Sequence, residues 1–162
     1  MNLKNIKQKN IDLSSYGIST NTDITLKLSE ILISIEGMDN VTLSFPKGVY
    51  KISRKYAFES YKNIANHDNS LKRIAFLMKN MDGLTIDGNG SLFIFYDEVI
   101  PFAIEDSSNV TLKNLSVDFI LPFHSELEVV SSDLNKKSFT VKINTELDCY
   151  KIEKKTHSVQ TI

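Results

Sequence analysis

A short motif that occurs twice between residues 83 and 114 constrains this chain more than any other feature. Gly83-Leu-Thr-Ile-Asp-Gly returns 26 residues later as Asn109-Val-Thr-Leu-Lys-Asn. A fainter copy, Asn40-Val-Thr-Leu, begins 43 residues before the first. In each copy a turn-forming residue precedes the order apolar, threonine, apolar, which is the alternation of a short strand. Repeats of about 20 to 50 residues are typical of solenoids, in which each unit buries its apolar face against the next.

The motif also predicts which side chains are buried. The apolar residues of both copies are expected to point inward and the threonines outward, where β-branched residues suit an exposed strand face. The residues that follow, Asp87–Gly90 and Lys113-Asn114, are predicted turns, because Gly and Asn tolerate the left-handed conformation of a sharp corner. The simplest fold with these properties is all-β: a parallel β-helix whose coils stack in register.

Length and composition limit the classes of function. The chain has 162 residues, which is enough for one domain with a sizeable core. Its net charge of −1 gives no reason to expect a nucleic acid or a membrane surface as partner. The single cysteine excludes an intrachain disulfide framework. The three histidines lack the spacing of metal ligands, so we predict no metal and no cofactor.

The N-terminus gives little information about localisation. Residues 1–7 contain lysines but no apolar segment follows them, so they do not form a signal peptide. No apolar run approaches transmembrane length. As written, the sequence predicts a cytoplasmic chain, unless a preceding signal has been lost from its start.

Residues 1–37 are predicted to form a weak strand and a capping helix. Thr20–Asp23 offers several N-cap residues, and Gly37 is placed as the helix stop. Between them lies one apolar stripe at helical spacing: Ile24, Leu28, Ile31, Leu32 and Ile35. A solenoid exposes its core at an open end, so we expect this amphipathic helix to cover the first coil.

Residues 38–124 are predicted to form the coils themselves. Strands are expected within Val41–Ile52 and at Ile74–Met78, Leu92–Phe95 and Pro101–Ile104. Tyr56–Lys72 lacks a clean period and is predicted to be a loop that leaves the solenoid, held by an ion pair among Asp68, Lys72 and Arg73.

Residues 125–162 have a different pattern. Leu127–Val130 and Phe139–Ile143 alternate, and Asp133–Lys137 between them is a hairpin-type turn. An antiparallel hairpin does not continue a parallel solenoid. We therefore predict that an inserted antiparallel β unit begins here and is incomplete within the chain, so that a partner, a second copy or further sequence covers the open solenoid end.

Several stretches together resemble the N-terminal region of glycoside hydrolase family 110, the bacterial exo-α-galactosidases. The strand-turn-helix opening and the motif after Leu84 are generic to pectate-lyase-like β-helix proteins. More specific are the runs Asp68–Phe76 and Pro122–Glu126, and Phe45–Tyr50 and Asp118–Leu121 also match. The resemblance covers roughly Ile11 to Ile143. Phe119 departs from it, because a Trp is expected after the Asp.

The resemblance implies a right-handed parallel β-helix with inserted antiparallel β-barrel domains. It implies an inverting enzyme that removes terminal α-1,3-linked galactose, and a secreted or periplasmic bacterial protein. Inversion needs two carboxyl groups about 6.5–9.5 Å apart. In the family these lie on later coils, so no catalytic residue is assigned here, and the chain alone is expected to be inactive.

The candidate substrate-binding residues are Asp118, His124 and Glu126. They cluster where the chain leaves the predicted solenoid, and carboxylate and imidazole groups are suitable partners for sugar hydroxyls. The structural alternative is a turn in which Asp118 and Ser125 bond nearby backbone groups. The functional alternative to a hydrolase is a non-catalytic β-helix module that binds glycan or assembles with a partner.

Overall fold

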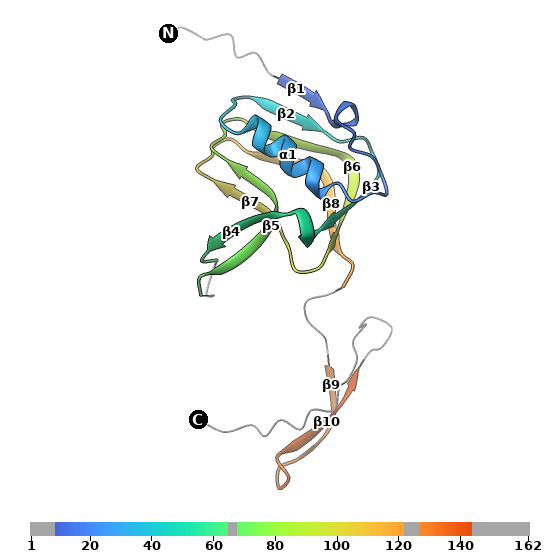
Figure 1. Ribbon diagram of the computed structural model, residues 1–162. Coiled ribbons are helices and arrows are strands. Elements are labelled where there is room, and N and C mark those ends of the chain that lie inside the picture. Colours follow the sequence, from blue (N-terminus) through green and yellow to red (C-terminus); the bar gives the residue numbers. More distant parts are fainter. Residues whose placement is uncertain (1–8, 65–67, 122–126, 144–162) are drawn as a thin grey trace. The chain divides into compact units, whose positions relative to one another are not determined.

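The computed structural model describes residues 9–64, 68–121 and 127–143. The described residues are mostly strands in parallel sheets and include one α-helix, which agrees with the predicted all-β class (Figure 1). The chain divides into two compact units, with the boundary after Ile120. The predicted boundary between residues 124 and 125 lies outside the described residues.

The first unit contains the helix α1 (Thr25–Ile35), short 3-10 helices at Leu13–Tyr16 and Arg54–Tyr56, and the strands β1 to β8. The strands are β1 (Lys9–Asp12), β2 (Val41–Ser44), β3 (Val49–Ser53), β4 (Phe58–Lys62), β5 (Ser70–Lys79), β6 (Thr85–Tyr96), β7 (Ile100–Glu105) and β8 (Thr111–Phe119).

The copies of the motif lie side by side in one parallel sheet. Thr42 of β2 pairs with Thr85 of β6, which pairs with Thr111 of β8. The inward apolar residues follow the same register, because Leu43 and Ile86, both fully buried, are succeeded by half-buried Leu112. Equivalent residues of the repeated motif are therefore neighbours in space.

The turn-forming residue that opens each copy has a positive φ angle. The values are 55° at Asn40, 78° at Gly83 and 54° at Asn109. Side chains other than Gly and Asn rarely adopt this left-handed conformation. The middle copy opens with Gly instead of Asn for a steric reason, since a Cβ on Gly83 would lie 2.7 Å from Oδ1 of Asn40.

A second row of parallel pairs follows a corner in β6. The register shifts between Asp87 and Ser91, and Asn89 and Gly90 there have positive φ angles, as the predicted turn requires. Beyond it Tyr50, Phe93 and Val117 pair in order. The strand predicted at Leu92–Phe95 is thus the second half of a continuous, bent β6.

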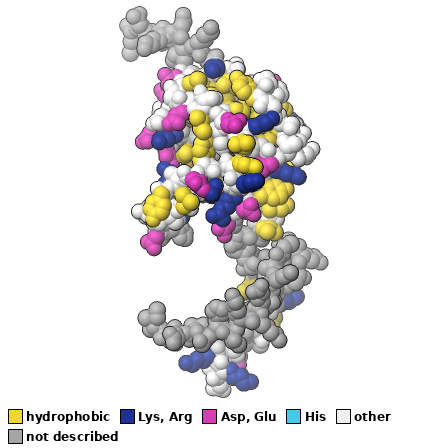
Figure 2. All heavy atoms as spheres, in the orientation of Figure 1, with side chains coloured by type: hydrophobic (Ala, Val, Ile, Leu, Met, Phe, Trp, Pro, Cys, Tyr) yellow, Lys and Arg dark blue, Asp and Glu magenta, His cyan; other side chains and the backbone are white. Residues whose placement is uncertain are grey.

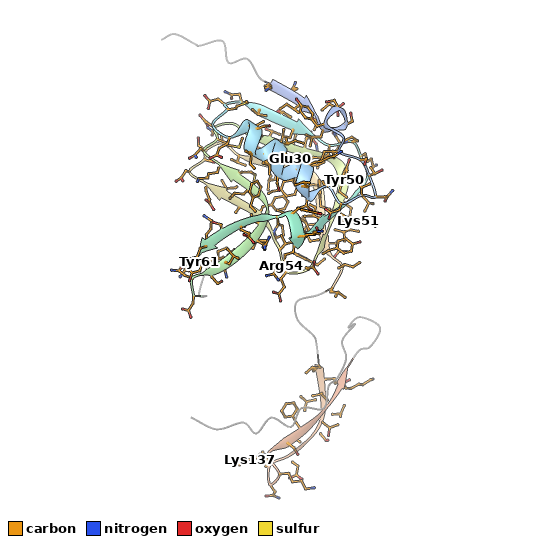
Figure 3. The ribbon with its side chains drawn as sticks, viewed as in Figure 1. Glu30, Tyr50, Lys51, Arg54, Tyr61 and Lys137 are labelled. Atoms are coloured by element: carbon orange, nitrogen blue, oxygen red, sulfur yellow. The ribbon has the colours of Figure 1, made fainter. Side chains whose placement is uncertain are left out.

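The region Tyr56–Lys72, predicted to be a loop, instead forms an antiparallel hairpin of β4 and β5 (Figure 1). The loop prediction was wrong because the hairpin is stabilised by cross-strand pairs, which leave no apolar period in the sequence. Exposed Tyr61, labelled in Figure 3, lies opposite exposed Leu71, and the carboxylate of Glu59 pairs with Arg73. The ion pair was expected among Asp68, Lys72 and Arg73, but Arg73 pairs with Glu59 instead.

The other edge of β5 pairs in parallel with β7, and Phe76 lies opposite Phe102 with ring centroids 4.9 Å apart. The rings of Phe45 and Phe76 also pack edge-on against Phe93, at 5.0 and 5.6 Å. This aromatic cluster is almost completely buried and lies between the sheets. Burial of such rings supplies much of the apolar area that stabilises the unit.

The helix α1 packs against β5 and β3 and lies where the sequence predicts it (Figure 1). It begins at Thr25 with Ile24 at the N-cap position, whose side chain makes no capping hydrogen bond, and Oδ1 of the preceding Asp23 accepts the Thr25 N–H at 3.0 Å. The predicted apolar stripe is buried, with Ile24, Leu28 and Ile35 exposing 2% or less of their surface. Leu26 and Ile33 lie on the exposed face of the helix. Figure 2 shows that hydrophobic and charged side chains are interspersed on the visible face of the first unit.

The second unit contains the predicted antiparallel hairpin, formed by β9 (Leu127–Asp133) and β10 (Ser138–Ile143). A bulge between Thr140 and Val141 shifts its register. At the turn, Oδ1 of Asp133 accepts the N–H groups of Asn135 and Lys136, at 3.0 and 3.1 Å. Val129 and Phe139 are more than half exposed, and two isolated strands are rarely stable alone.

In the part of the chain that the structure describes, α1 is the one α-helix, and it is too short to cross a membrane.

Candidate functional site

Asp118 is the one predicted site residue that the structure describes. It lies on β8, exposed, opposite Ile94 of β6, which in turn lies opposite Lys51 of β3. Its Oδ1 accepts the backbone N–H of Phe119 at 2.8 Å. A local hydrogen bond of this type is expected if Asp118 only bonds nearby backbone groups in a turn. The bond leaves the carboxylate at the surface, where a ligand can reach it.

The surface around Asp118 combines apolar and polar groups. Phe93 and Phe95 of β6 are fully buried, so the alternate residues Leu92, Ile94 and Tyr96 point outward and are half-buried. Ser116 lies opposite Leu92, and Ser53 lies opposite Tyr96. We call the outward residues Leu92, Ile94, Tyr96, Ser116 and Asp118 the outer face. A sugar ring presents an apolar face and polar hydroxyl groups. The aromatic and aliphatic side chains of this surface suit the apolar face, and its hydroxyl and carboxylate groups suit the sugar hydroxyls.

Phe119, the departure from the family pattern, belongs to the core. Its ring lies 5.5 Å from that of Phe95, with which it pairs in register. An aromatic residue here therefore packs inward instead of contacting a ligand at the outer face. The alternation of Val117, Asp118 and Phe119 along β8 already indicates this orientation.

His124 and Glu126, the other two predicted site residues, lie outside the described residues. The structure therefore does not test whether they lie near Asp118.

A shallow depression of about 580 Å³ lies on the corner where the turns of the motif stack. It is lined by residues that sequence reasoning did not select: Asp39, Asn80, Met81, Asp82, Asp106, Ser107 and Ser108. In the sequence, a polar residue precedes each left-handed position of the motif. These polar residues are Asp39, Asp82 and Ser108, and they form β-bridges in register.

The carboxylate of Asp82 joins two of these stacked turns by hydrogen bonds. Its Oδ1 accepts Ser108 Oγ at 2.6 Å and Asn109 Nδ2 at 2.7 Å. These hydrogen bonds lower the pKa of Asp82, the one from Ser108 most strongly. A carboxyl group held ionised in this way is a poor general acid, so we assign Asp82 a structural role.

Asp87 has the same role at the next corner. Its Oδ1 accepts Asn114 Nδ2 and the Asn89 N–H, both at 3.0 Å, and Lys113 Nζ lies 3.2 Å from Oδ2. The hydrogen bond from Asn114 and then that from Asn89 lower the pKa of Asp87. Within the three described ranges, no group of His, Cys, Asp and Glu side chains is arranged to hold a metal ion.

Comparison with known proteins identifies relatives, although no family model matches the chain. The α-1,3-galactosidase A of Shewanella woodyi is 31% identical over 148 residues, which are 90% of this chain and 24% of the relative. The α-1,3-galactosidase B of Bacteroides thetaiotaomicron is 31% identical over 150 residues, 91% of this chain and 24% of the relative. That of Bacteroides fragilis is 32% identical over 132 residues, 77% and 22%.

The similarity extends over most of this chain, whereas the chain spans about a quarter of the length of these curated relatives. It includes the motif copies, the hairpin β4–β5 and Asp118, which all lie within residues 40–119. Over the part that it shares with them, the chain belongs with the α-1,3-galactosidase-like proteins.

Proposed function

We propose that this chain is the opening part of a glycoside hydrolase of the α-1,3-galactosidase type, which removes terminal α-1,3-linked galactose with inversion. The observation that carries the proposal is the 31% identity to α-1,3-galactosidase A over 90% of the chain. A match over a continuous region of this length does not depend on a single motif.

The parallel sheets fit the first coils of a right-handed β-helix, the fold implied by the family resemblance. Three observations support this architecture: the motif copies pair in parallel register, the chain turns a corner within β6, and β5 pairs in parallel with β7 in a second sheet. Repeating units stacked in this way present a long, rigid outer surface on which a binding site can be built.

In this proposal Asp118, with His124 and Glu126, contributes hydrogen bonds to the sugar at the rim of the site. Asp118 supports it by its exposure on the outer face, directly opposite the half-buried Ile94, which lies two residues before Tyr96 on β6. An ionised carboxylate accepts strong hydrogen bonds from sugar hydroxyl groups.

The two catalytic acids are proposed to lie in the part of the relatives that this chain does not match. Asp82 and Asp87 are poor candidates, because hydrogen bonds hold both carboxylates below their usual pKa. An inverting enzyme needs one carboxyl group that stays protonated long enough to donate to the leaving oxygen. The chain alone is thus expected to bind sugar without hydrolysing it.

The test is a chimaera in which this chain replaces the matched segment of the Shewanella woodyi relative, assayed beside the isolated chain on α-1,3-galactobiose and p-nitrophenyl α-galactoside. We expect galactose release by the chimaera and none by the isolated chain. A chimaera that melts cooperatively but lacks activity would contradict the proposal, and the alternative of a non-catalytic glycan-binding module would then be favoured. Hydrolysis by the isolated chain would contradict our placement of the catalytic acids.

A further inference from the structure

Tyr96 is the aromatic member of the outer face. The neighbouring aromatic residues Phe95 and Phe119 point to the other side of the sheet, where their ring centroids lie 5.5 Å apart. Tyr96 follows Phe95 on β6 and has the opposite orientation, because successive side chains of a strand alternate between its two faces. Its side chain is half-buried, so part of the ring is accessible from the surface that carries Asp118.

The register of the sheet brings Tyr96 and Asp118 close enough for one hexose to contact both. Asp118 of β8 lies opposite Ile94, two residues before Tyr96 on β6. Neighbouring strands are about 4.8 Å apart and each residue adds about 3.3 Å along a strand, so the Cα atoms of this diagonal pair are about 8 Å apart. Half-buried Ile94 supplies apolar surface beside them.

The strands on both sides of Tyr96 are fixed by hydrogen bonds. On β3, Ser53 lies opposite Tyr96, and its hydroxyl donates to Oδ2 of Asp23 at 2.6 Å. On the other side, the N–H of Ile120 donates to the carbonyl of Phe95 at 3.0 Å, so the chain still follows β6 at this point. A ring on a strand held in this way is well positioned before a ligand binds.

The charges of the outer surface favour a neutral ligand. Exposed Lys51, labelled in Figure 3, and exposed Asp118 lie on opposite sides of Ile94 in one row of the sheet. One positive and one negative group in the same row give neither an anionic nor a cationic ligand a net advantage. A neutral sugar, which needs apolar contact and hydrogen bonds, fits this surface better.

We infer that the terminal galactose stacks on the ring of Tyr96 while Asp118 accepts hydrogen bonds from its hydroxyl groups. The axial 4-hydroxyl of galactose leaves the C–H groups at C3, C4 and C5 together on the opposite face of the sugar, which gives an aromatic ring a continuous apolar surface to contact. In glucose the equatorial 4-hydroxyl interrupts this surface. The inference rests on the proposed function, from which it takes the ligand, and it adds Tyr96 as a residue that determines specificity.

The first test measures kcat and KM for α-1,3-galactobiose in the chimaera that carries this chain. Tyr96→Ala should raise KM about tenfold or more and leave kcat within about twofold, because it removes binding that substrate and transition state share. Tyr96→Phe keeps the ring and should restore most of the affinity. The matched control is Tyr61→Ala, which removes a 71% exposed tyrosine from the hairpin β4–β5 and should leave KM unchanged.

The second test is saturation-transfer difference NMR of the full 162-residue chain with α-1,3-galactobiose, after irradiation of the aromatic protons. The strongest saturation should fall on the protons at C3, C4 and C5 of the terminal galactose. Tyr96→Ala should lose this signal and Tyr96→Phe should keep it. An α-1,3-linked glucose disaccharide should give a weaker signal at the same positions. Circular dichroism melting checks that each variant is folded, and a purely structural role of Tyr96 would not select these sugar protons.

The two tests separate failure of this inference from failure of the proposed function. An active chimaera in which Tyr96→Ala leaves KM unchanged, or in which Tyr61→Ala raises it equally, overturns the inference and leaves the proposed function standing. A folded but inactive wild-type chimaera contradicts the proposed function, and the NMR experiment then decides. Saturation that depends on Tyr96 would support galactose stacking in a binding module, and its absence would overturn the inference.

Discussion

The hydroxyl of Ser53 donates a hydrogen bond to Oδ2 of Asp23 at 2.6 Å, across 30 residues of sequence. The other oxygen of Asp23 accepts from the N–H of Thr25, at 3.0 Å, and from its hydroxyl, at 2.6 Å. Thr25 Oγ1 in turn accepts the Ser53 N–H at 2.8 Å. One carboxylate therefore binds the first residue of α1 and also ties it to the end of β3.

Removing this carboxylate should destabilise the first unit. Asp23→Ala loses the hydrogen bonds to Thr25 at the start of the helix and the link to Ser53, so the free energy of unfolding should fall by about 1–2 kcal/mol. Urea unfolding followed by circular dichroism measures the change. Asp39→Asn, at an exposed acid away from the helix, should have a much smaller effect, and equal losses in the two variants would show that the network around Asp23 is not specific.

The same network predicts a dependence of stability on pH. Burial, the largest influence, raises the pKa of Asp23, but the hydrogen bonds from Ser53 and Thr25 together outweigh it and lower the pKa below its ordinary value of 3.8. A carboxyl group with a depressed folded-state pKa stabilises the fold above its unfolded pKa and loses this contribution as the pH falls through the folded pKa. The melting temperature should therefore drop below about pH 4.

Asp23→Asn removes this titration, so the variant should be less stable than the parent at neutral pH and the difference should shrink in acid. Melting curves at several pH values provide the comparison. A difference that stays constant from neutral pH to acid would exclude Asp23 as a source of the acid sensitivity.

Two leucines of α1 form a matched pair that tests how this helix covers the core. Leu28 is fully buried and Leu26 is 49% exposed. Leu28→Ala should cost about 2–5 kcal/mol, because it leaves a cavity under the helix. Leu26→Ala should cost far less, since alanine has the higher helix propensity and little packing is lost. Chemical denaturation of both variants gives the two values, and similar small losses would mean that α1 does not seal the core.

The left-handed positions of the motif predict an unusual order of stability. Asn109 has a φ of 54° and donates to Asp82. Asn109→Ala and Asn109→Gly both lose that hydrogen bond, so their difference isolates the backbone conformation. The glycine variant should be more stable by about 1 kcal/mol, the reverse of the order in ordinary helix or strand positions. Thermal unfolding of the pair measures this, and a more stable alanine variant would contradict the φ-based explanation.

Asp118 can be tested in the active chimaera. Asp118→Asn keeps the size of the side chain and its ability to accept the Phe119 N–H, but removes the charge. Charge-assisted hydrogen bonds contribute about 1.5–3 kcal/mol, so kcat/KM for α-1,3-galactobiose should fall about tenfold or more, mostly through KM. Asp39→Asn is the control. An unchanged KM in Asp118→Asn would leave this residue with a structural role.

Several parts of the fold follow from local patterns. The repeated order at Gly83 and Asn109 predicted neighbouring strands, and the apolar stripe from Ile24 to Ile35 predicted the helix that packs on β5. Both signals are strong because burial imposes a period on the sequence. The hairpin β4–β5 was missed because Tyr61 and Leu71 face solvent and its charged pair, Glu59 with Arg73, joins residues far apart in sequence.

The candidate site was less predictable than the fold. The position of Asp118 on an exposed face follows from the alternation along β8, but its neighbours Ile94 and Tyr96 come from another strand, and sequence alone does not give the register that brings them together. The acidic depression around Asp82 was missed for the same reason, because its residues come from separate turns that meet only when the sheet forms.

The most direct test of the central claim is the release of galactose from α-1,3-galactobiose by the chimaera that carries this chain in the Shewanella woodyi relative. We expect release well above that of the isolated chain, with the α-1,3 disaccharide preferred to an α-1,4-linked one. A folded chimaera that releases no galactose, or an isolated chain that releases as much, would contradict it.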